Sequence, residues 1–201
     1  MRLILMRHGE TTWNAESRLQ GQENSDLSER GIAQARGFRK FIRVLNPARV
    51  VASDLGRTRQ TAELIGHGDC PSDPRLREWN MGIWTGRTKP DLIAENADLY
   101  HAWRAGRHTP EGSEPWEVFR ARVAEGLRHW LAAGEGDLLA VVHGGVTRAA
   151  MDAFVGLPPA RLIPVTQGTG TILSFTPGDF RSAKLEAYNM GAVVPDADVA
   201  D

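Results

Sequence analysis

The 201-residue sequence is poor in cysteine, in long hydrophobic runs and in any excess of charge of one sign. A single cysteine, Cys70, excludes an intramolecular disulfide, and its surroundings of Gly, Asp and Pro favour an incidental thiol over a catalytic one. No apolar stretch is long enough to span a bilayer, and the run at 3–6 is too short for the hydrophobic part of a signal peptide. We therefore expect no membrane partner and take the cytoplasm as the default compartment.

The charges nearly cancel, because 24 Lys and Arg residues face 25 Asp and Glu residues, for a formal net charge of -1. Proteins that bind nucleic acid or an anionic membrane surface usually carry a basic excess, so this balance argues against both partners. Any positive potential must be local, as in a pocket for a small anion. The length suits one domain with a substantial core, and the sequence leaves open whether the chain forms a homodimer.

Strands and helices alternate along the sequence. Short apolar runs predict buried strands, and apolar residues at helical spacing predict amphipathic helices. The expected strands are 3–6, 50–53, 138–142, 171–175 and 184–188, and a turn at Pro177-Gly178 joins the last two. The expected helices run from Ser28 to Pro47, over 56–65, from Pro115 at the first helical position to Gly134, and over 145–155. Residues 11–27 are expected to form a loop. This alternation predicts an α/β fold, a three-layer α/β/α sandwich with a mostly parallel central sheet.

The segment at 79–114 is the least regular part of the sequence. It is rich in tryptophan and predicts only two modest helices, at 91–95 and 99–107. Two interpretations stay open: a partial lid over a crevice of the sheet, or a helical excursion in which tryptophan serves for packing. We expect residues 1–192 to form one domain that includes this segment, followed by an acidic tail at 193–201.

Two of the expected strands end in a histidine followed by glycine. The first runs into Arg7 and His8, and the strand at 138–142 runs into His143. Ligand crevices of open α/β sheets lie beyond the carboxyl ends of the strands, so neighbouring parallel strands would place both imidazoles in one crevice. The strand at 50–53 brings Arg57 to the same edge. Two guanidiniums and two imidazoles together make a receptor for a tetrahedral dianion.

Four short motifs are spread over nearly the whole chain. They are Arg7-His8-Gly9-Glu10-Thr11, Ser53-x-Leu55-x-Arg57-x-x-Gln60-Thr61-Ala62, Leu76-x-Glu78 with Gly82-x-Trp84-x-Gly86, and His143-Gly144-Gly145. Together and in this order they resemble the motifs of the histidine phosphatase superfamily, also called phosphoglycerate mutase-like. The resemblance implies the phosphoglycerate mutase-like fold and a site for phosphoryl transfer.

A histidine can act as the nucleophile of such a site. A good fraction of free imidazole is unprotonated near neutral pH, since its reference pKa is about 6.5. Attack on phosphorus gives a phosphohistidine and splits one difficult displacement into two easier ones. The resemblance implies this role for His8, and implies that Arg7, Arg57 and His143 bind the transferring phosphoryl group. Further donors are expected from Asn14 and from the backbone at Gly144, next to the start of the helix expected over 145–155.

A leaving alkoxide needs a proton. The resemblance places Glu78 over the phosphate, where Trp79 is expected to help shield it from water. We therefore expect Glu78 to act as general acid and then as base for the hydrolytic water. The plainer alternative is a surface salt bridge from Glu78 to Arg75 or Arg77. Glu10 is the second candidate for the acid, although its neighbours indicate a structural role.

Metal-assisted hydrolysis would need clustered carboxylate and imidazole ligands, whereas the motif positions carry arginine, so we expect neither a metal nor another cofactor. The expected substrate is a small-molecule phosphate ester. Mutases of the superfamily are typically longer, with an added basic segment that is not found here, which favours a phosphatase over mutase-type phosphotransfer. A non-catalytic phospholigand-binding module would not need His8, His143 and Glu78 together. The order Gly112-Ser113-Glu114 also differs from the Gly-Glu-Ser that is more usual in the family.

Overall fold

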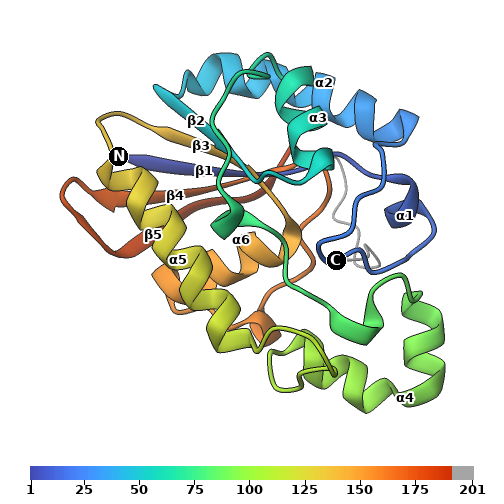
Figure 1. Ribbon diagram of the computed structural model, residues 1–201. Coiled ribbons are helices and arrows are strands. Elements are labelled where there is room, and N and C mark those ends of the chain that lie inside the picture. The colour runs from blue at the N-terminus through green and yellow to red at the C-terminus, as the bar shows by residue number, and fades with distance from the viewer. Residues whose placement is uncertain (192–201) are drawn as a thin grey trace.

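A five-stranded sheet in the order β2-β3-β1-β4-β5 forms the centre of the computed structural model, which describes residues 1–191 (Figure 1). The strands are β1 (Arg2–Arg7), β2 (Arg49–Ala52), β3 (Leu138–Val142), β4 (Gly170–Thr176) and β5 (Asp179–Met190). The expected acidic tail at 193–201 lies outside the described residues.

The sheet is mixed, so the expectation of a mostly parallel sheet is only partly right. Strand β3 pairs in parallel with both β1 and β2, whereas β4 pairs antiparallel with β1 and with β5. The physical reason is the short turn at Pro177-Gly178. A tight turn can join only antiparallel neighbours, because a parallel pair needs a long crossover connection. Four strands therefore share one direction, and β4 runs against them.

Helices cover both faces of the sheet, which confirms the three-layer sandwich (Figure 1). One face packs against α2 (Glu29–Leu45) and α3 (Gly56–Leu64), and the other against α5 (Trp116–Ala132) and α6 (Gly144–Ala150). Side chains of a strand alternate between the two faces. In β1, Leu3 and Leu5 belong to the core under α5, and Ile4 and Met6 to the core under α2.

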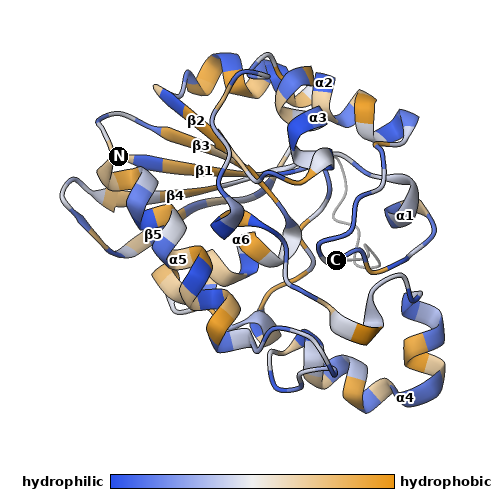
Figure 2. Cartoon of the chain, in the orientation of Figure 1, coloured by the Kyte–Doolittle hydropathy of each residue, from blue (hydrophilic) through white to orange (hydrophobic). Residues whose placement is uncertain are grey.

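Burial of the central strands follows from this double cover. All five residues of β3 are fully buried, and Figure 2 shows the strands as a largely hydrophobic band between helices with mixed surfaces. Parallel strands covered on both faces are typically continuous apolar runs of this kind.

In the described residues no helix is both long and apolar enough to cross a membrane.

Several observed helix boundaries differ from the expected ones. Thr11 and Asn14 form a capping box that starts the one-turn helix α1 (Thr12–Ala15) inside the expected loop at 11–27. Pro115 is the residue before α5 and not its first helical position. The expected helix at 145–155 is α6 followed by a π-helical turn at Met151–Val155.

The segment at 79–114 holds a 3₁₀ turn at Gly82–Trp84 and the helix α4 (Lys89–Arg104). The two expected short helices are halves of α4, which is kinked where Asn96 leaves helical geometry. Trp79 and Trp103 are buried and stack with ring centroids 5.3 Å apart, so tryptophan packs the segment onto the core. Figure 1 shows α4 on the side where β1 and β3 end. A partial lid stays a prediction. Further 3₁₀ turns lie at Pro74–Leu76 and Pro159–Arg161.

Candidate active site

The register of β1 and β3 brings the two motif histidines together. Arg7 pairs with Val142, so His8 and His143 are the next residues beyond the two strand ends, and the His8 backbone N–H donates to the Val142 carbonyl at 3.0 Å. The two imidazole rings lie with centroids 5.3 Å apart at 65° to one another. Both side chains are almost fully buried. The two imidazoles therefore lie side by side beyond the carboxyl ends of β1 and β3, as expected from parallel neighbouring strands.

The orientation of His8 leaves one ring nitrogen for chemistry. Its Nδ1 lies 2.7 Å from the Gly9 carbonyl oxygen, which can only accept a hydrogen bond, so Nδ1 carries the proton and Nε2 carries the lone pair. Gly9 is needed for this arrangement, since a Cβ atom there would lie 2.4 Å from the Gly31 carbonyl oxygen at the start of α2. Close packing of α2 on this loop thus sets the position of the imidazole.

Arg57 meets His8 from the first turn of α3. Its Nε donates to His8 Nε2 at 3.2 Å, and its two terminal nitrogens donate to the carbonyls of Glu23 at 2.6 Å and Gly21 at 2.8 Å. Burial lowers the pKa of Arg57 to about 10, so the guanidinium stays positive at neutral pH. The sequence did not reveal these carbonyl partners, although Gly21, with φ of +54°, marks the sharp turn that presents them.

Arg7, the last residue of β1, is the second buried arginine near the two imidazoles. Its side chain is 1% exposed, and Nη1 donates to the Val165 carbonyl. Gly144, the first residue of α6, leaves room for it, since a Cβ atom at position 144 would lie 3.3 Å from the guanidinium carbon. The structure therefore gathers Arg7, Arg57 and the two histidines in one buried cluster.

Both imidazoles are neutral near pH 7 in this environment. Burial, followed by the positive charges of Arg57 and Arg7, lowers the pKa of His8 well below 6.5, against a smaller opposing effect of the Gly9 carbonyl. Burial and then Arg57 lower the pKa of His143 in the same way. Within residues 1–191 neither ring nitrogen of His143 has a hydrogen-bond partner, so this imidazole can donate to an added oxyanion.

Glu78 reaches the same place from the loop before the tryptophan-rich segment. Its carboxylate is buried and accepts hydrogen bonds from the backbone N–H of Trp79 at 2.8 Å and of Gly145 at 3.0 Å. A Cβ atom on Gly145 would lie 2.2 Å from Glu78 Oε1, so only glycine admits the carboxylate. Gly145 was not among the expected site residues, and its signal was the second glycine of His143-Gly144-Gly145.

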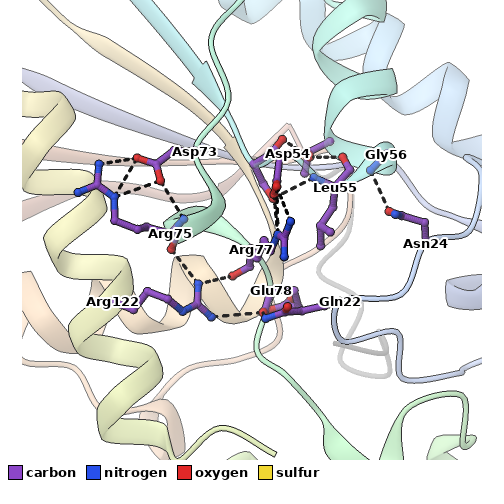
Figure 3. Close-up of polar contacts among 12 residues, drawn as sticks. Gln22, Asn24, Asp54, Leu55, Gly56, Asp73, Arg75, Arg77, Glu78 and Arg122 are labelled. Atoms are coloured by element: carbon purple, nitrogen blue, oxygen red, sulfur yellow. Dashed lines mark hydrogen bonds and ion pairs between the residues drawn. The ribbon is translucent and has the colours of Figure 1, made fainter.

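The salt-bridge alternative for Glu78 is wrong. Arg75 forms ion pairs with Asp73 and Glu125, and Arg77 forms a bidentate pair with Asp54, as Figure 3 shows for the Asp73 and Asp54 pairs. Both guanidiniums are therefore paired with carboxylates other than Glu78. Glu78 is a buried carboxylate held by peptide N–H groups.

The two remaining site candidates, Asn14 and Glu10, have structural contacts. Asn14 uses its side-chain oxygen as an acceptor in the α1 capping box. No described residue accepts a hydrogen bond from its side-chain N–H groups, so these stay available to a ligand. Glu10 accepts from the Ser28 hydroxyl at 2.7 Å and pairs with Arg30 at 3.3 Å, which ties the loop after β1 to the start of α2. In the described part of the chain, no three His, Cys, Asp or Glu side chains are grouped closely enough to hold a metal ion.

Residues 3–187 match the family model of the histidine phosphatase superfamily (branch 1), and the chain belongs to this superfamily. The chain is 39% identical over 166 residues to a probable phosphoglycerate mutase of Enterobacter sp. (strain 638), covering 79% of this chain and 76% of the relative. Among solved structures it is similar to a mycobacterial glucosyl-3-phosphoglycerate phosphatase, with 31% identity, a TM-score of 0.85, and coverage of 94% of this chain and 98% of that one. It is also similar to a putative α-ribazole-5'-P phosphatase of Escherichia coli, with 28% identity, a TM-score of 0.78 and coverage of 96% and 99%.

Proposed function

We propose that the protein is a phosphomonoester hydrolase that acts on small phosphorylated metabolites through a phosphohistidine intermediate. The observation that carries the proposal is the state of His8. Its Nδ1 proton is bound by the Gly9 carbonyl, and its Nε2 lone pair accepts a hydrogen bond from Arg57 Nε, which an incoming phosphoryl group would replace. A neutral imidazole aimed at a buried cation is arranged to attack an anionic phosphoryl group held by that cation.

In the first step, His8 Nε2 attacks phosphorus and the bond from phosphorus to the ester oxygen breaks. Arg7, Arg57 and His143 bind the oxygens of the transferring group and stabilise the charge that develops on them. Protonated Glu78 gives its proton to the leaving alkoxide. In the second step, Glu78 takes a proton from water, the water oxygen attacks phosphorus, and inorganic phosphate leaves with His8 neutral again.

The names of the relatives support two reactions. The solved structures include phosphatases for glucosyl-3-phosphoglycerate and, as a putative assignment, α-ribazole-5'-P, whereas the relative from Enterobacter is a probable phosphoglycerate mutase. A phosphohistidine intermediate is compatible with both reactions. Its phosphoryl group is transferred to water in a phosphatase and to a second substrate hydroxyl in a mutase. Measuring inorganic phosphate release and isomer formation from 3-phosphoglycerate in one reaction separates them. Isomer formation in excess of phosphate release would establish the mutase.

The covalent step is tested by rapid quenching with a ³²P-labelled phosphate ester. We expect an acid-labile, base-stable phosphoenzyme that is absent in His8→Ala. His67→Ala is the matched control, since this histidine lies in the loop after α3. Label retained by His8→Ala would contradict the assignment, and ligand binding without any label or turnover would favour the non-catalytic phospholigand-binding module.

The acid role of Glu78 is tested through the leaving group. An alkyl alkoxide must be protonated as it departs, whereas p-nitrophenolate leaves unaided. General acid catalysis contributes about 10²–10⁴-fold. We expect Glu78→Gln to slow phosphoenzyme formation from alkyl phosphates by a factor in this range and from p-nitrophenyl phosphate far less. Equal losses for the two esters in single-turnover measurements would remove Glu78 from proton transfer.

A further inference from the structure

The main chain around Glu78 is held by a side chain from another layer of the fold. Residues 77–80 lie outside any helix or strand, and only the Arg77 N–H is tied to the preceding 3₁₀ turn, by a hydrogen bond to the Pro74 carbonyl at 3.2 Å. Arg122, in α5, donates through Nη1 to the carbonyls of Arg75 at 2.8 Å and Arg77 at 3.1 Å, and its Nη2 lies 3.5 Å from the Glu78 carbonyl (Figure 3). Gln22 donates to the same Glu78 carbonyl at 3.2 Å.

Arg122 is itself fixed by Glu114. Its Nε and Nη2 donate to the two carboxylate oxygens of Glu114 at 2.9 and 2.7 Å, a bidentate, charge-assisted pair. Both side chains are largely shielded from solvent, with 22% and 15% of their surface exposed. The Glu114 main chain also accepts from the Trp79 indole N–H and donates to the Asn80 carbonyl. The unusual order Gly112-Ser113-Glu114 thus places a carboxylate where Arg122 can bind it.

These contacts hold the main chain on both sides of Glu78 in the sequence. Arg122 holds the carbonyls of residues 75, 77 and 78, and Glu114 holds Trp79 and Asn80. The Glu78 carboxylate in turn depends on this backbone, because one of its two donors is the N–H of Trp79. A shift of the segment would move the carboxyl group relative to Gly145, its other donor and the start of the helix that follows His143.

We propose that Arg122 and Glu114 form a positioning pair that sets the place of the general acid Glu78. The proposal rests on the proposed function, in which Glu78 protonates the leaving group. Neither member of the pair transfers a proton. Their contribution is the rigid fork of the guanidinium, which donates to main-chain carbonyls on one side and to a carboxylate on the other. A misplacement of about 1 Å in such a site can cost about 10²-fold in rate.

Arg122→Lys is the informative variant, because it keeps the positive charge and loses the fork. An ammonium group cannot donate in parallel to several carbonyls and to both oxygens of Glu114. We expect single-turnover phosphoenzyme formation from an alkyl phosphate to fall about 10- to 10²-fold, while that from p-nitrophenyl phosphate changes by less than about threefold. A loss of phosphate binding or of general stability would slow both esters alike.

Two further variants distinguish a misplaced Glu78 from a change in local charge and from a destabilised fold. Arg120→Lys is the matched control on the same helix, since Arg120 pairs with Glu117 and Asp152 and, among residues 1–191, has no hydrogen bond or ion pair with the Glu78 segment. Glu114→Gln should shift the same ratio of alkyl to aryl rates, and its effect should not add to that of Arg122→Lys, because the two residues act as one unit. Arg120→Lys should leave the ratio unchanged.

Amide hydrogen exchange gives a readout that needs no substrate. The N–H groups of Trp79 and Gly145 donate to the Glu78 carboxylate, so Arg122→Lys should speed their exchange at least tenfold relative to core amides of β3. Exchange that is unchanged at both amides would overturn the proposal. So would equal rate losses for the two esters in a folded Arg122→Lys protein.

The proposal and the proposed function fail in different ways. If Glu78→Gln discriminates between the two esters and Arg122→Lys does not, the positioning pair is refuted and the acid role of Glu78 stands. If Glu78→Gln itself slows both esters equally, the acid role falls and takes the positioning proposal with it. That second outcome is visible without any Arg122 variant.

Discussion

Acid should unfold this protein through its two neutral site histidines. His8 and His143 are 2% and 0% exposed, and burial together with the neighbouring arginines lowers the pKa of both well below 6.5. The unfolded chain has no such burial, so there each imidazole takes up a proton near its ordinary pKa. Below about pH 6.5 the unfolded state therefore binds more protons than the folded state, and falling pH favours unfolding.

The size of the effect follows from proton linkage. Each histidine that stays neutral in the folded state lowers the free energy of unfolding by about 2 kcal/mol between pH 7 and pH 5, with a limiting slope of about 1.4 kcal/mol per pH unit. Two such groups remove a large part of the roughly 5–15 kcal/mol that stabilises a typical domain. Three of the carboxylates with lowered pKa values, Asp54, Asp73 and Asp137, have an ordinary pKa of 3.8 and so lose their contribution to stability at lower pH than the histidines do.

The assay is urea unfolding at pH values from 7 to 5 for the wild type, His8→Gln, His143→Gln and the exposed control His129→Gln. Each site variant should lose about 2 kcal/mol less than the wild type over this range. Sulfate should stabilise the wild type more at pH 5 than at pH 7, because a bound dianion supplies the counter-charge for protonated imidazoles. If the wild type and both site variants lose the same free energy, the folded imidazoles are not neutral and the reasoning fails.

Gly145→Ala should reduce turnover of alkyl phosphates by about 10²-fold in steady-state assays, because its Cβ atom would lie 2.2 Å from Glu78 Oε1 and must displace the carboxylate. Gly37→Ala, in an open position of α2, is the control and should raise the free energy of unfolding by about 1 kcal/mol; a normal alkyl phosphate rate in Gly145→Ala would contradict the docking of Glu78. A chelator should leave turnover unchanged, since arginines surround the phosphoryl site, and activity lost to the chelator and restored by Mg²⁺ or Zn²⁺ would refute this.

The part of the site on strand ends was predictable from the sequence. Apolar runs identify β1 and β3, and the polar residues that follow such strands meet wherever the strands are parallel neighbours. Once the structure shows β1 and β3 to be parallel neighbours, that rule places His8 beside His143. The mixed sheet was harder to predict, because the turn at Pro177-Gly178 indicates a hairpin but does not say which edge of the sheet the hairpin joins.

The supports of the site could not be predicted, because most of them are peptide groups. Arg57 is held by the carbonyls of Gly21 and Glu23, and Arg122 by the carbonyls of Arg75 and Arg77. Every residue has a carbonyl, so no sequence pattern distinguishes those that accept a guanidinium from those that do not. Only the fold, which brings α3 and α5 against these loops, reveals the contacts.

The junction of β3 and α6 joins the proposed phosphoryl site to the proposed acid Glu78. His143 supplies an imidazole, Gly144 leaves room for the Arg7 guanidinium, and Gly145 both leaves room for the Glu78 carboxylate and donates a hydrogen bond to it. Three consecutive residues thus set one imidazole, one cation and the proposed proton donor against the same short piece of main chain. In the proposed mechanism, the distance from the phosphoryl group to Glu78 depends on how the Glu78 segment is held against this main chain. The proposed role of the pair of Arg122 and Glu114 is to set that distance.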